Sequence, residues 1–368
     1  MFLPRNRTMA EIEGHGSAGS DPTERYFRHT SRKAMFLVAC GAVLFVIMLF
    51  SITVGTFSIP LEDVVRALFG QQGTYYNIVW NIRLPRIMAG IVAGASLAVA
   101  GTVMQCVLRN PLASPYTLGL SQSAAFGAAF AIIFLGAGST MASTTSSVVV
   151  NNPYTVTLMA FIWAIVGTTL IMLLSAMTRV SPEAMILAGV AIAAIFQAGI
   201  TALQFFADSV QLSTMVYWTF GDLGRVTWEH LMILAAVLAP ILMYFIYSRW
   251  SYNAMDAGEE TANGLGVNTK RMRMVGMVLS SMLAAVVVSF MGIIGFIGLV
   301  APHMTRRIIG GDHRFLIPGS ALVGAILLMG SDTIARTVIS PLVIPVGVIT
   351  AFLGGPLFIY LLIKGYKK

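Results

Sequence analysis

Charged side chains are scarce in this chain of 368 residues: Asp, Glu, Lys and Arg make up 10%, against roughly 25% in an ordinary soluble domain. No polar stretch is long enough to enclose a hydrophobic core of its own, which argues against a separate soluble domain. Apolar residues dominate instead, since 57% of the chain is hydrophobic and the mean hydropathy is +0.82. The composition therefore predicts a polytopic membrane protein.

Cysteine is almost absent as well. Cys40 and Cys106 are the two present, and both lie inside apolar segments. We interpret them as small buried hydrophobic residues, and not as a disulfide or a metal site. The sequence predicts neither a metal nor a cofactor.

Several motifs that carry chemistry are missing. The chain has no G-x-x-x-x-G-K-[ST] phosphate loop and no H-E-x-x-H metal motif, and its five histidines are scattered. Acids within apolar segments are few, with Asp208 and Asp332 near predicted outer ends, so no relay of carboxylates crosses the bilayer. The chain offers a path without a visible energy source, which must come from a partner or from a substrate gradient.

Long apolar segments are what the sequence does have. Each is near the roughly 20 residues that a bilayer requires, although the eighth is short. We therefore expect an all-α membrane protein of about ten transmembrane helices. The segments are Ala34–Val54, Arg83–Leu108, Tyr116–Gly136, Val156–Met177, Ala184–Phe206, His230–Tyr247, Met274–Ile294, Ile297–Ile309, Gly319–Val338 and Pro345–Ile363.

Lys and Arg predict the orientation. An even number of spans places both termini on one side, and 18 of the 23 basic residues fall on that side. The positive-inside rule then puts both termini in the cytoplasm. The net charge of +8 is accounted for by this bias and by anionic lipid, so we do not expect a nucleic acid partner. Residues 1–33 are polar and predict a flexible cytoplasmic tail, followed by a transmembrane permease domain over 34–368.

Two arginines stand where membrane physics does not favour them. Arg83 and Arg86 lie three residues apart at the predicted outer start of a span, with Pro85 in its first turn. Positive charge is unfavourable at a helix N-terminus and scarce on the outer face. We therefore expect the pair to meet a partner.

Small residues recur along the same span, at Gly90, Gly94, Ala98 and Gly101. Such residues let helices approach closely in lipid. Two interpretations stay open, ordinary packing inside one bundle and a face for dimerisation, and we favour the first.

The longest inner connection, about 248–273, is neither apolar nor simply basic. Its segment 255–266 predicts a short helix that ends at glycine. Glu259 and Glu260 could face a cytoplasmic motor, or the segment could be a solvated loop helix.

A series of motifs then follows in fixed order. The motifs are Arg83-Leu84-Pro85-Arg86, Gly101 with Gln105, Arg109-Asn110-Pro111-Leu112-Ala113 with Pro115, Leu118-Gly119, Gly295-Phe296-Ile297-Gly298-Leu299-Val300 with Pro302-His303, Arg306, Gly311-Asp312-His313-Arg314, Asp332 with Arg336, and Pro345-Val346-Gly347 with Thr350, Gly354, Pro356 and Phe358. This order resembles the permeases of ABC importers for iron-siderophore complexes, haem and cobalamin, the vitamin B12 type of importer.

The resemblance implies a type II ABC importer permease fold and a set of partners. It implies a second permease subunit, identical or homologous, two cytoplasmic ABC ATPase subunits and an extracytoplasmic substrate-binding protein. ATP hydrolysis would belong to the ATPase subunits, so this chain would have no catalytic residue. The implied location is the cell membrane, plasma or inner, with multiple passes.

The resemblance also implies roles for particular residues. The ATPase-coupling residues would be Gly258, Glu259, Ala262, Leu265 and Gly266. The residues that dock the binding protein would be Arg83, Arg86 and Arg336. The turn at Ser181, Pro182 and Glu183 lies where the family narrows its cytoplasmic gate, although it could simply cap the fifth span.

One position departs from the family. Val343 stands where a glutamate is usual, so we expect the outer carboxylate beside Arg336 to be missing. Either Arg336 is then freer to reach a partner, or the local ion pairs are rearranged.

Three functional hypotheses result. The first is a permease for ATP-driven import of iron-siderophore complexes, with cobalamin, another corrinoid or haem as alternative cargo. The second is a stand-alone secondary transporter, which would need acids and broken helices at the membrane midplane. The third, an intramembrane enzyme, lacks a nucleophile–base or metal set.

Overall fold

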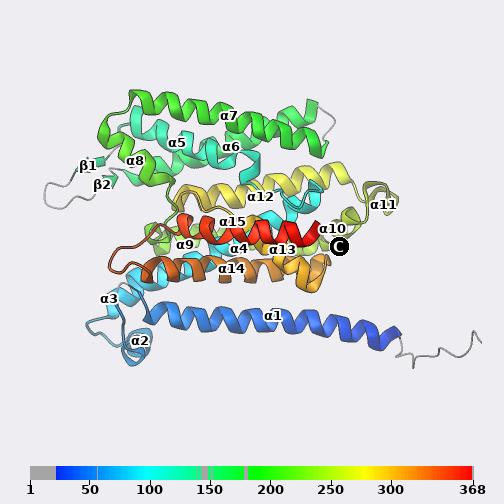
Figure 1. Cartoon of the computed structure of the whole chain (residues 1–368), viewed down its shortest axis with the longest axis horizontal. Coiled ribbons are helices and arrows are strands. Elements are labelled where there is room, and N and C mark those ends of the chain that lie inside the picture. The colour runs from blue at the N-terminus through cyan, green and yellow to red at the C-terminus, as the bar shows by residue number, and fades with distance from the viewer. Residues whose placement is uncertain are drawn as a thin grey trace, which may run out of the picture.

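The computed structural model describes residues 22–55, 57–137, 139–141, 148–150, 152–177 and 181–366, and its long helices lie side by side along one axis (Figure 1). Two three-residue strands pair antiparallel, with Thr140 opposite Val149. The elements in chain order are α1 Pro22–Thr53, α2 Leu61–Leu68, α3 Tyr76–Ile78, the π-helical turn Val79–Arg83, α4 Leu84–Val107, the 3-10 turn Tyr116–Leu118, α5 Leu120–Phe134, β1 Ser139–Met141, β2 Val148–Val150, α6 Pro153–Met177, α7 Pro182–Phe206, α8 Ser209–Thr219, the 3-10 turn Leu223–Arg225, α9 Trp228–Tyr247, α10 Arg249–Asp256, α11 Glu259–Gly264, α12 Thr269–Met291, α13 Ile297–Ile309, α14 His313–Thr337 and α15 Val346–Tyr366.

The all-α class is confirmed, and each predicted apolar segment overlaps an α-helix, although the ends differ. Within the described residues, seven helices are long and apolar enough to cross a membrane, and α5 and residues 346–360 of α15 are apolar but shorter. The count of ten spans stays a prediction.

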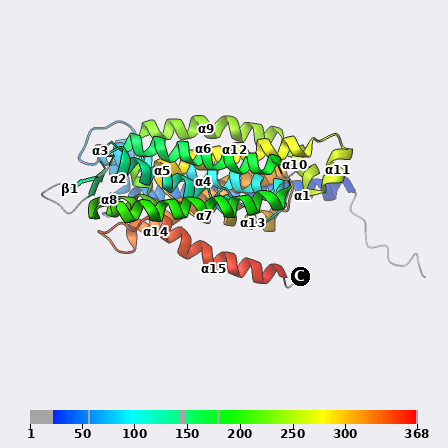
Figure 2. The same ribbon diagram turned by 90° about the horizontal axis from the view of Figure 1, so that it is seen from above.

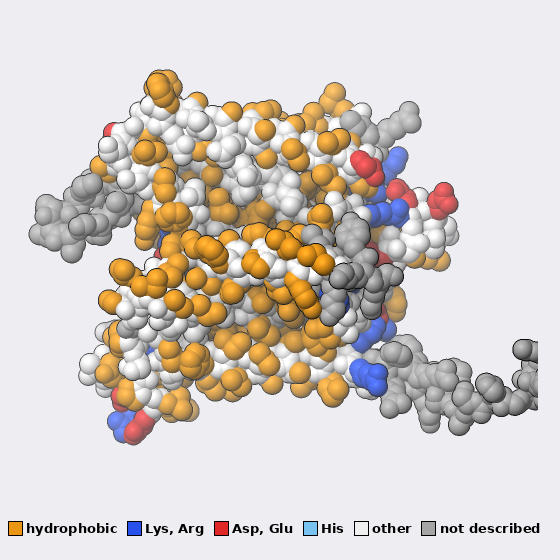
Figure 3. Space-filling view, in the orientation of Figure 1, with side chains coloured by type: hydrophobic (Ala, Val, Ile, Leu, Met, Phe, Trp, Pro, Cys, Tyr) orange, Lys and Arg blue, Asp and Glu red, His pale blue; other side chains and the backbone are white. Residues whose placement is uncertain are grey.

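The two ends of the bundle differ in charge and in the elements they carry. α1 begins and α15 ends at the end that also carries α10 and α11, while α2, α3, α8 and the β-hairpin lie at the opposite end (Figure 1). Lys and Arg side chains gather at the α10–α11 end (Figure 3). Following the predicted orientation, we call this the inner end and the other the outer end.

α1 starts earlier than expected. Residues 1–21 of the predicted tail lie outside the described residues, but residues 22–33 of that tail are helical and continue into the apolar part of α1. No Gly or Pro interrupts residues 23–33, and Pro22 suits the first turn of a helix. The helix therefore extends beyond the apolar segment.

α4 forms the centre of the bundle and contacts α12, α13 and α14. A Cβ built on Gly94 would overlap the carbonyl oxygen of Gly324 on α14, and one on Gly101 would overlap that of Gly298 on α13. The small residues of α4 thus pack against helices of the same chain. This confirms the interpretation as packing within one bundle.

A break in the backbone explains why α13 is short. Gly292 ends α12 with φ 77° and Phe296 precedes α13 with φ 66°, so the chain turns back inside the bundle. The carbonyl oxygen of Met291 accepts a hydrogen bond from the backbone N–H of Asp222 at 2.9 Å. Irregular backbone at membrane depth needs such partners within the protein, and here the α8–α9 connection supplies one.

α15 packs mainly against two helices of the bundle. It contacts α13 and α14 and diverges from the other helices toward its C-terminal end (Figure 2). Near its middle, Gly354 lets the ring of Phe296 approach the helix backbone. An apolar cavity of about 220 Å³ lies beside it, lined by Ile47, Leu327 and Leu357 among others.

Candidate functional site

The outer end holds a cluster of three arginines, of which Arg83 lies at the end of the π-helical turn. Arg83 is buried, and it donates hydrogen bonds to the carbonyl oxygens of Ile52 and Phe57 at 2.5 and 2.6 Å. Its guanidinium also lies over the Phe57 ring, 5.0 Å from the centroid. Arg83 therefore joins the start of α4 to the end of α1 and the segment after it.

Arg86 and Arg336 share one carboxylate. Arg86 donates to Asp332 from Nε and Nη2, at 3.0 and 2.9 Å from Oδ1, and its Nη2 lies 3.3 Å from Asp222. Arg336 donates from Nε to the other Asp332 oxygen at 3.0 Å and from Nη2 to the Ser51 hydroxyl. Asp332 is buried away from water, and its carboxylate forms ion pairs with two guanidinium groups.

The expectation that Arg336 lacks a neighbouring carboxylate is wrong. Asp332 stands one turn before it on α14, a spacing that places two side chains on the same helix face. Arg336 is buried and is not freer to reach a partner. Asp222 is thus a site residue that sequence reasoning missed. Asp332 was named with Arg336 among the motifs, but their ion pair was not predicted, although the i,i+4 spacing was a usable signal for it.

The structure brings the three predicted docking arginines together. A Cβ on Gly55 would lie 3.2 Å from Nη1 of Arg336 and 3.4 Å from Nη2 of Arg83, so both guanidinium groups meet beside this glycine. The side chain of Arg86 is 13% exposed. Three cations face the two carboxylates of Asp222 and Asp332, which leaves the cluster with a net positive charge.

The predicted coupling segment lies at the inner end as two short helices. Gly258, with φ 126°, separates α10 from α11, and Gly266, with φ 81°, follows the end of α11. Both values are costly for residues with a Cβ. Ala262 is buried on the inward face of α11, while Leu265, just after the helix, is 69% exposed. The segment thus packs against the bundle through Ala262 and exposes the apolar side chain of Leu265.

Arg273 connects this segment to the central helix. Glu259 accepts from Arg273 Nη2 at 3.1 Å, and Arg273 Nε donates to the carbonyl oxygen of Val107 at the end of α4 at 3.0 Å. Burial raises the pKa of Glu259, but the hydrogen bond and charge of Arg273 outweigh it and hold this pKa below its ordinary value. Arg273 therefore contacts both α11 and α4, so that a displacement of α11 would be transmitted to α4 through this side chain.

The turn at Ser181, Pro182 and Glu183 begins α7 at the inner end. The Ser181 hydroxyl accepts from the backbone N–H of Ala184 at 3.2 Å, and Pro182 occupies the first turn. The capping interpretation of this turn is confirmed, with Ser181 as the N-cap residue. Its role in a gate stays a prediction.

A cavity of about 500 Å³ lies at the inner end between α4, α10 and α13. Its polar side chains are two arginines, one histidine, one glutamine and one carboxylate. Burial raises the pKa of Asp256, but the hydrogen bond and charge of His313 and the charge of Arg306 hold it below its ordinary value. The lining residues are Gln105, Arg109, Pro111, Asp256, Ala257, Gly258, His303 and Arg306.

Comparison with known proteins identifies the family. Residues 43–364 match the model of the FecCD transport family. The chain belongs to the FecCD transport family. Together with its apolar helices, this membership makes it an integral membrane protein and an ABC importer permease.

Relatives of this FecCD permease support the assignment along most of its length. It is 53% identical over 349 residues to a candidate ABC transporter permease of Methanocaldococcus jannaschii, covering 95% of this chain and 99% of the relative. It is 37% identical over 289 residues to the hemin transport system permease of Yersinia pestis, covering 78% and 84%. A solved structure described as an inward-facing conformation of a candidate metal-chelate type ABC transporter matches with a TM-score of 0.76 and 27% identity, over 90% of this chain and 99% of that one.

The shared carboxylate predicts a large effect for Asp332→Asn. The change leaves Arg336 buried without an ionised partner and removes the main partner of Arg86. We expect a loss of about 3–5 kcal/mol in stability, because removing one member of a buried ion pair strands the other. Thermal unfolding of the purified FecCD permease in detergent measures this as a lower midpoint.

Asp222→Asn is the matched control. Asp222 pairs with the same Arg86 but is 26% exposed and lies farther from it, so its loss should cost no more than about 1 kcal/mol. Equal midpoints for the two variants would contradict the central role of Asp332.

Proposed function

We propose that this chain is the transmembrane permease subunit of an ATP-driven importer for iron-siderophore complexes in the cell membrane, plasma or inner. The observation that carries the proposal is the coupling segment. In a FecCD-family chain, its buried Ala262, its exposed Leu265 and the Glu259–Arg273 ion pair form a docking element linked to α4. Such an element serves a chain whose energy comes from another protein.

The proposed partners are those that this chain would need for ATP-driven import. It has no phosphate loop, so two cytoplasmic ABC ATPase subunits would hydrolyse ATP and engage α10 and α11. A second permease subunit, identical or homologous, would complete the path. An extracytoplasmic substrate-binding protein would deliver cargo at the outer end. The turn at Ser181, Pro182 and Glu183 would narrow the inner exit as part of a gate.

The relatives differ in the cargo for which they are named. The Yersinia pestis relative is named for hemin, a Bacillus subtilis relative for Fe(3+)-citrate and a Vibrio cholerae relative for vitamin B12. The names are divided between iron compounds and vitamin B12, and we propose an iron-siderophore complex for this chain. Haem and cobalamin or another corrinoid, on the same architecture, are the alternatives.

A stand-alone secondary transporter gains no support from the buried acids. Asp332 binds two arginines at the outer end, and Asp222 pairs with one of them. Carboxylates neutralised in this way are poor sites for a coupling ion, which needs free oxygen ligands or a proton acceptor near the midplane.

Reconstitution tests the function. In proteoliposomes that hold the permease with its ATPase and binding protein, a ferric siderophore should accumulate only with ATP, and the permease alone should neither hydrolyse ATP nor transport. The same vesicles offered haem and cobalamin compare the cargo classes by initial rate. Gradient-driven uptake by the permease alone would overturn the proposal, and faster cobalamin or haem import would replace the cargo.

Leu265→Glu tests the coupling segment. Leu265 is exposed, so a charge there should leave the thermal midpoint of the permease unchanged but reduce ATPase co-purification and ATP-driven import by about tenfold or more, as expected for an apolar anchor at an interface. Leu61→Glu is the control, because Leu61 is 57% exposed on α2 at the outer end. A normal ATPase complex with the Leu265 variant would contradict the coupling role.

We further propose that Arg83, Arg86 and Arg336 guide the binding protein by the positive field of their cluster. Arg86 is part-exposed and the other two are buried, so the charges act mainly through space and affect encounter more than affinity. Arg83 suits a test, because its hydrogen-bond partners are carbonyl oxygens and its charge is not answered by a direct carboxylate pair.

Arg83→Gln should therefore slow association of the binding protein by about three- to tenfold at low salt, and by much less at high salt, where charges are screened. Stopped-flow association measures it. Arg66→Gln removes the same charge at the same end from an exposed side chain paired with Glu62, and should change the rate little. If both variants slowed association equally, the net charge of the outer end would explain the rate and the arginine cluster would have no particular role.

A further inference from the structure

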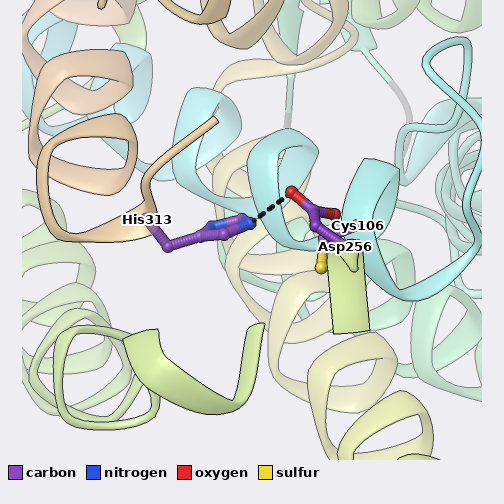
Figure 4. A group of neighbouring side chains, drawn as sticks. All are labelled: Cys106, Asp256 and His313. Carbon is purple, nitrogen blue, oxygen red and sulfur yellow. Dashed lines mark hydrogen bonds and ion pairs between the residues drawn. The ribbon is translucent and has the colours of Figure 1, made fainter. Parts of the chain in front are cut away.

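Three potential metal ligands meet at the inner end, beside the cavity that Asp256 lines. Cys106 comes from the end of α4, Asp256 from the end of α10 and His313 from the start of α14, and their side chains point toward one another (Figure 4). One ligand atom from each lies within 4.8 Å of the other two. Cys106 and His313 are buried, and the side chain of Asp256 is 28% exposed. Three elements far apart in sequence thus converge on one point.

The distances and the ligand types fit a borderline divalent cation. Nε2 of His313 lies 3.2 Å from Oδ2 of Asp256. Two ligands at about 2.0–2.1 Å from a tetrahedral zinc ion lie roughly 3.3 Å apart, so this pair already spans one edge of such a site. A thiolate, an imidazole and a carboxylate together favour Zn²⁺ over the hard cations Mg²⁺ and Ca²⁺.

Neighbouring residues position the three potential ligands and leave some of their ligand atoms available for a metal ion. Asn253 accepts from the backbone N–H of His313 at 2.8 Å, and Arg306 donates to Oδ2 of Asp256 at 3.1 Å. Within the described residues, Nδ1 of His313 has no hydrogen-bond partner, while Nε2 donates to Asp256 when no metal is bound. A metal ion at Nε2 displaces that proton, and the unpartnered Nδ1 is free to carry it. Arg306 can remain on the carboxylate when a metal binds, as an outer partner of a ligand.

A route to the site exists from the inner end. Asp256 lines the cavity of about 500 Å³, together with Gln105, His303 and the two arginines Arg109 and Arg306. A cation that enters passes these arginines and is attracted by the carboxylate of Asp256, and a water from the cavity can complete the coordination. Three protein ligands with one open position match the usual form of a non-structural zinc site.

We propose that Cys106, Asp256 and His313 bind a divalent metal ion that arrives from the cytoplasm, with Zn²⁺ as the best-fitting ion. Cys106 is then a ligand, in addition to being a small buried residue. Filled, the site joins α10, which precedes the coupling helix, to α4 and α14. A metal bound there opposes displacement of α10 and slows transport, a consequence that rests on the proposed function.

Cobalt binding to the purified full chain without a histidine tag tests the site directly. Titration with Co²⁺ should give one ion per chain, with a sulfur-to-cobalt charge-transfer band and visible d–d bands, and Zn²⁺ should abolish both. Cys106→Ser should lose the charge-transfer band, while Cys40→Ser, which changes the other buried cysteine, should keep it. Asp256→Asn should weaken binding by about 100-fold or more, beyond the loss seen for outer partners of ligands.

The absence of a charge-transfer band in the native chain, or its persistence in Cys106→Ser, overturns the site. If Cys106→Ser is not monodisperse, Asp256→Asn and His313→Asn decide by the same titration, and unchanged affinity in both overturns it.

Import in proteoliposomes tests the consequence separately. Zn²⁺ on the ATPase side should slow import by about fivefold or more in Cys40→Ser and leave Cys106→Ser unaffected. Equal rates with and without Zn²⁺ in Cys40→Ser overturn the regulatory consequence, while a lack of ATP-driven import without Zn²⁺ overturns the proposed function and leaves the binding result standing.

Discussion

The close approach of the α4 backbone to α13 and α14 is the constraint on which both ends of the molecule depend. Lipid tails are as apolar as the side chains they contact, so helices associate in a bilayer through close packing rather than through exclusion of water. Gly94 against Gly324 and Gly101 against Gly298 give α4 that packing. The same approach brings Arg86 to Asp332 at the outer end and sets Cys106 opposite His313 at the inner end.

The sequence predicted local features well because they depend on segment length and on residues close in the chain. The apolar segments and the glycine at which the short inner helix ends are of this kind. The partner of Arg86 was not predictable in the same way. It lies 246 residues away, and the pairing depends on the register between α4 and α14, which periodicity does not encode. The Cys106–Asp256–His313 cluster was missed for the same reason, since each residue looks ordinary on its own segment.

The two ends of the bundle handle charge in opposite ways. At the outer end, arginines fold inward onto Asp332, carbonyl oxygens and Ser51, so the charges act mainly through their field. At the inner end, Arg273 is buried, but it holds Glu259 beneath an exposed apolar tip at Leu265. The outer end is therefore suited to a partner that is attracted by charge and then released. The inner end is suited to a partner that applies force to α11 and, through Arg273, to α4.

The hydrogen bonds of Arg336 have a consequence for how the protein is made. Arg336 donates to the Ser51 hydroxyl and to the carbonyl oxygen of Val54, so a residue of α14, 285 positions after Ser51, holds the outer end of α1. During synthesis α1 enters the bilayer well before α14 exists. These bonds therefore form late in biogenesis, and a nascent or truncated chain without α14 has its first helix joined to the outer end through Arg83 but not through Arg336.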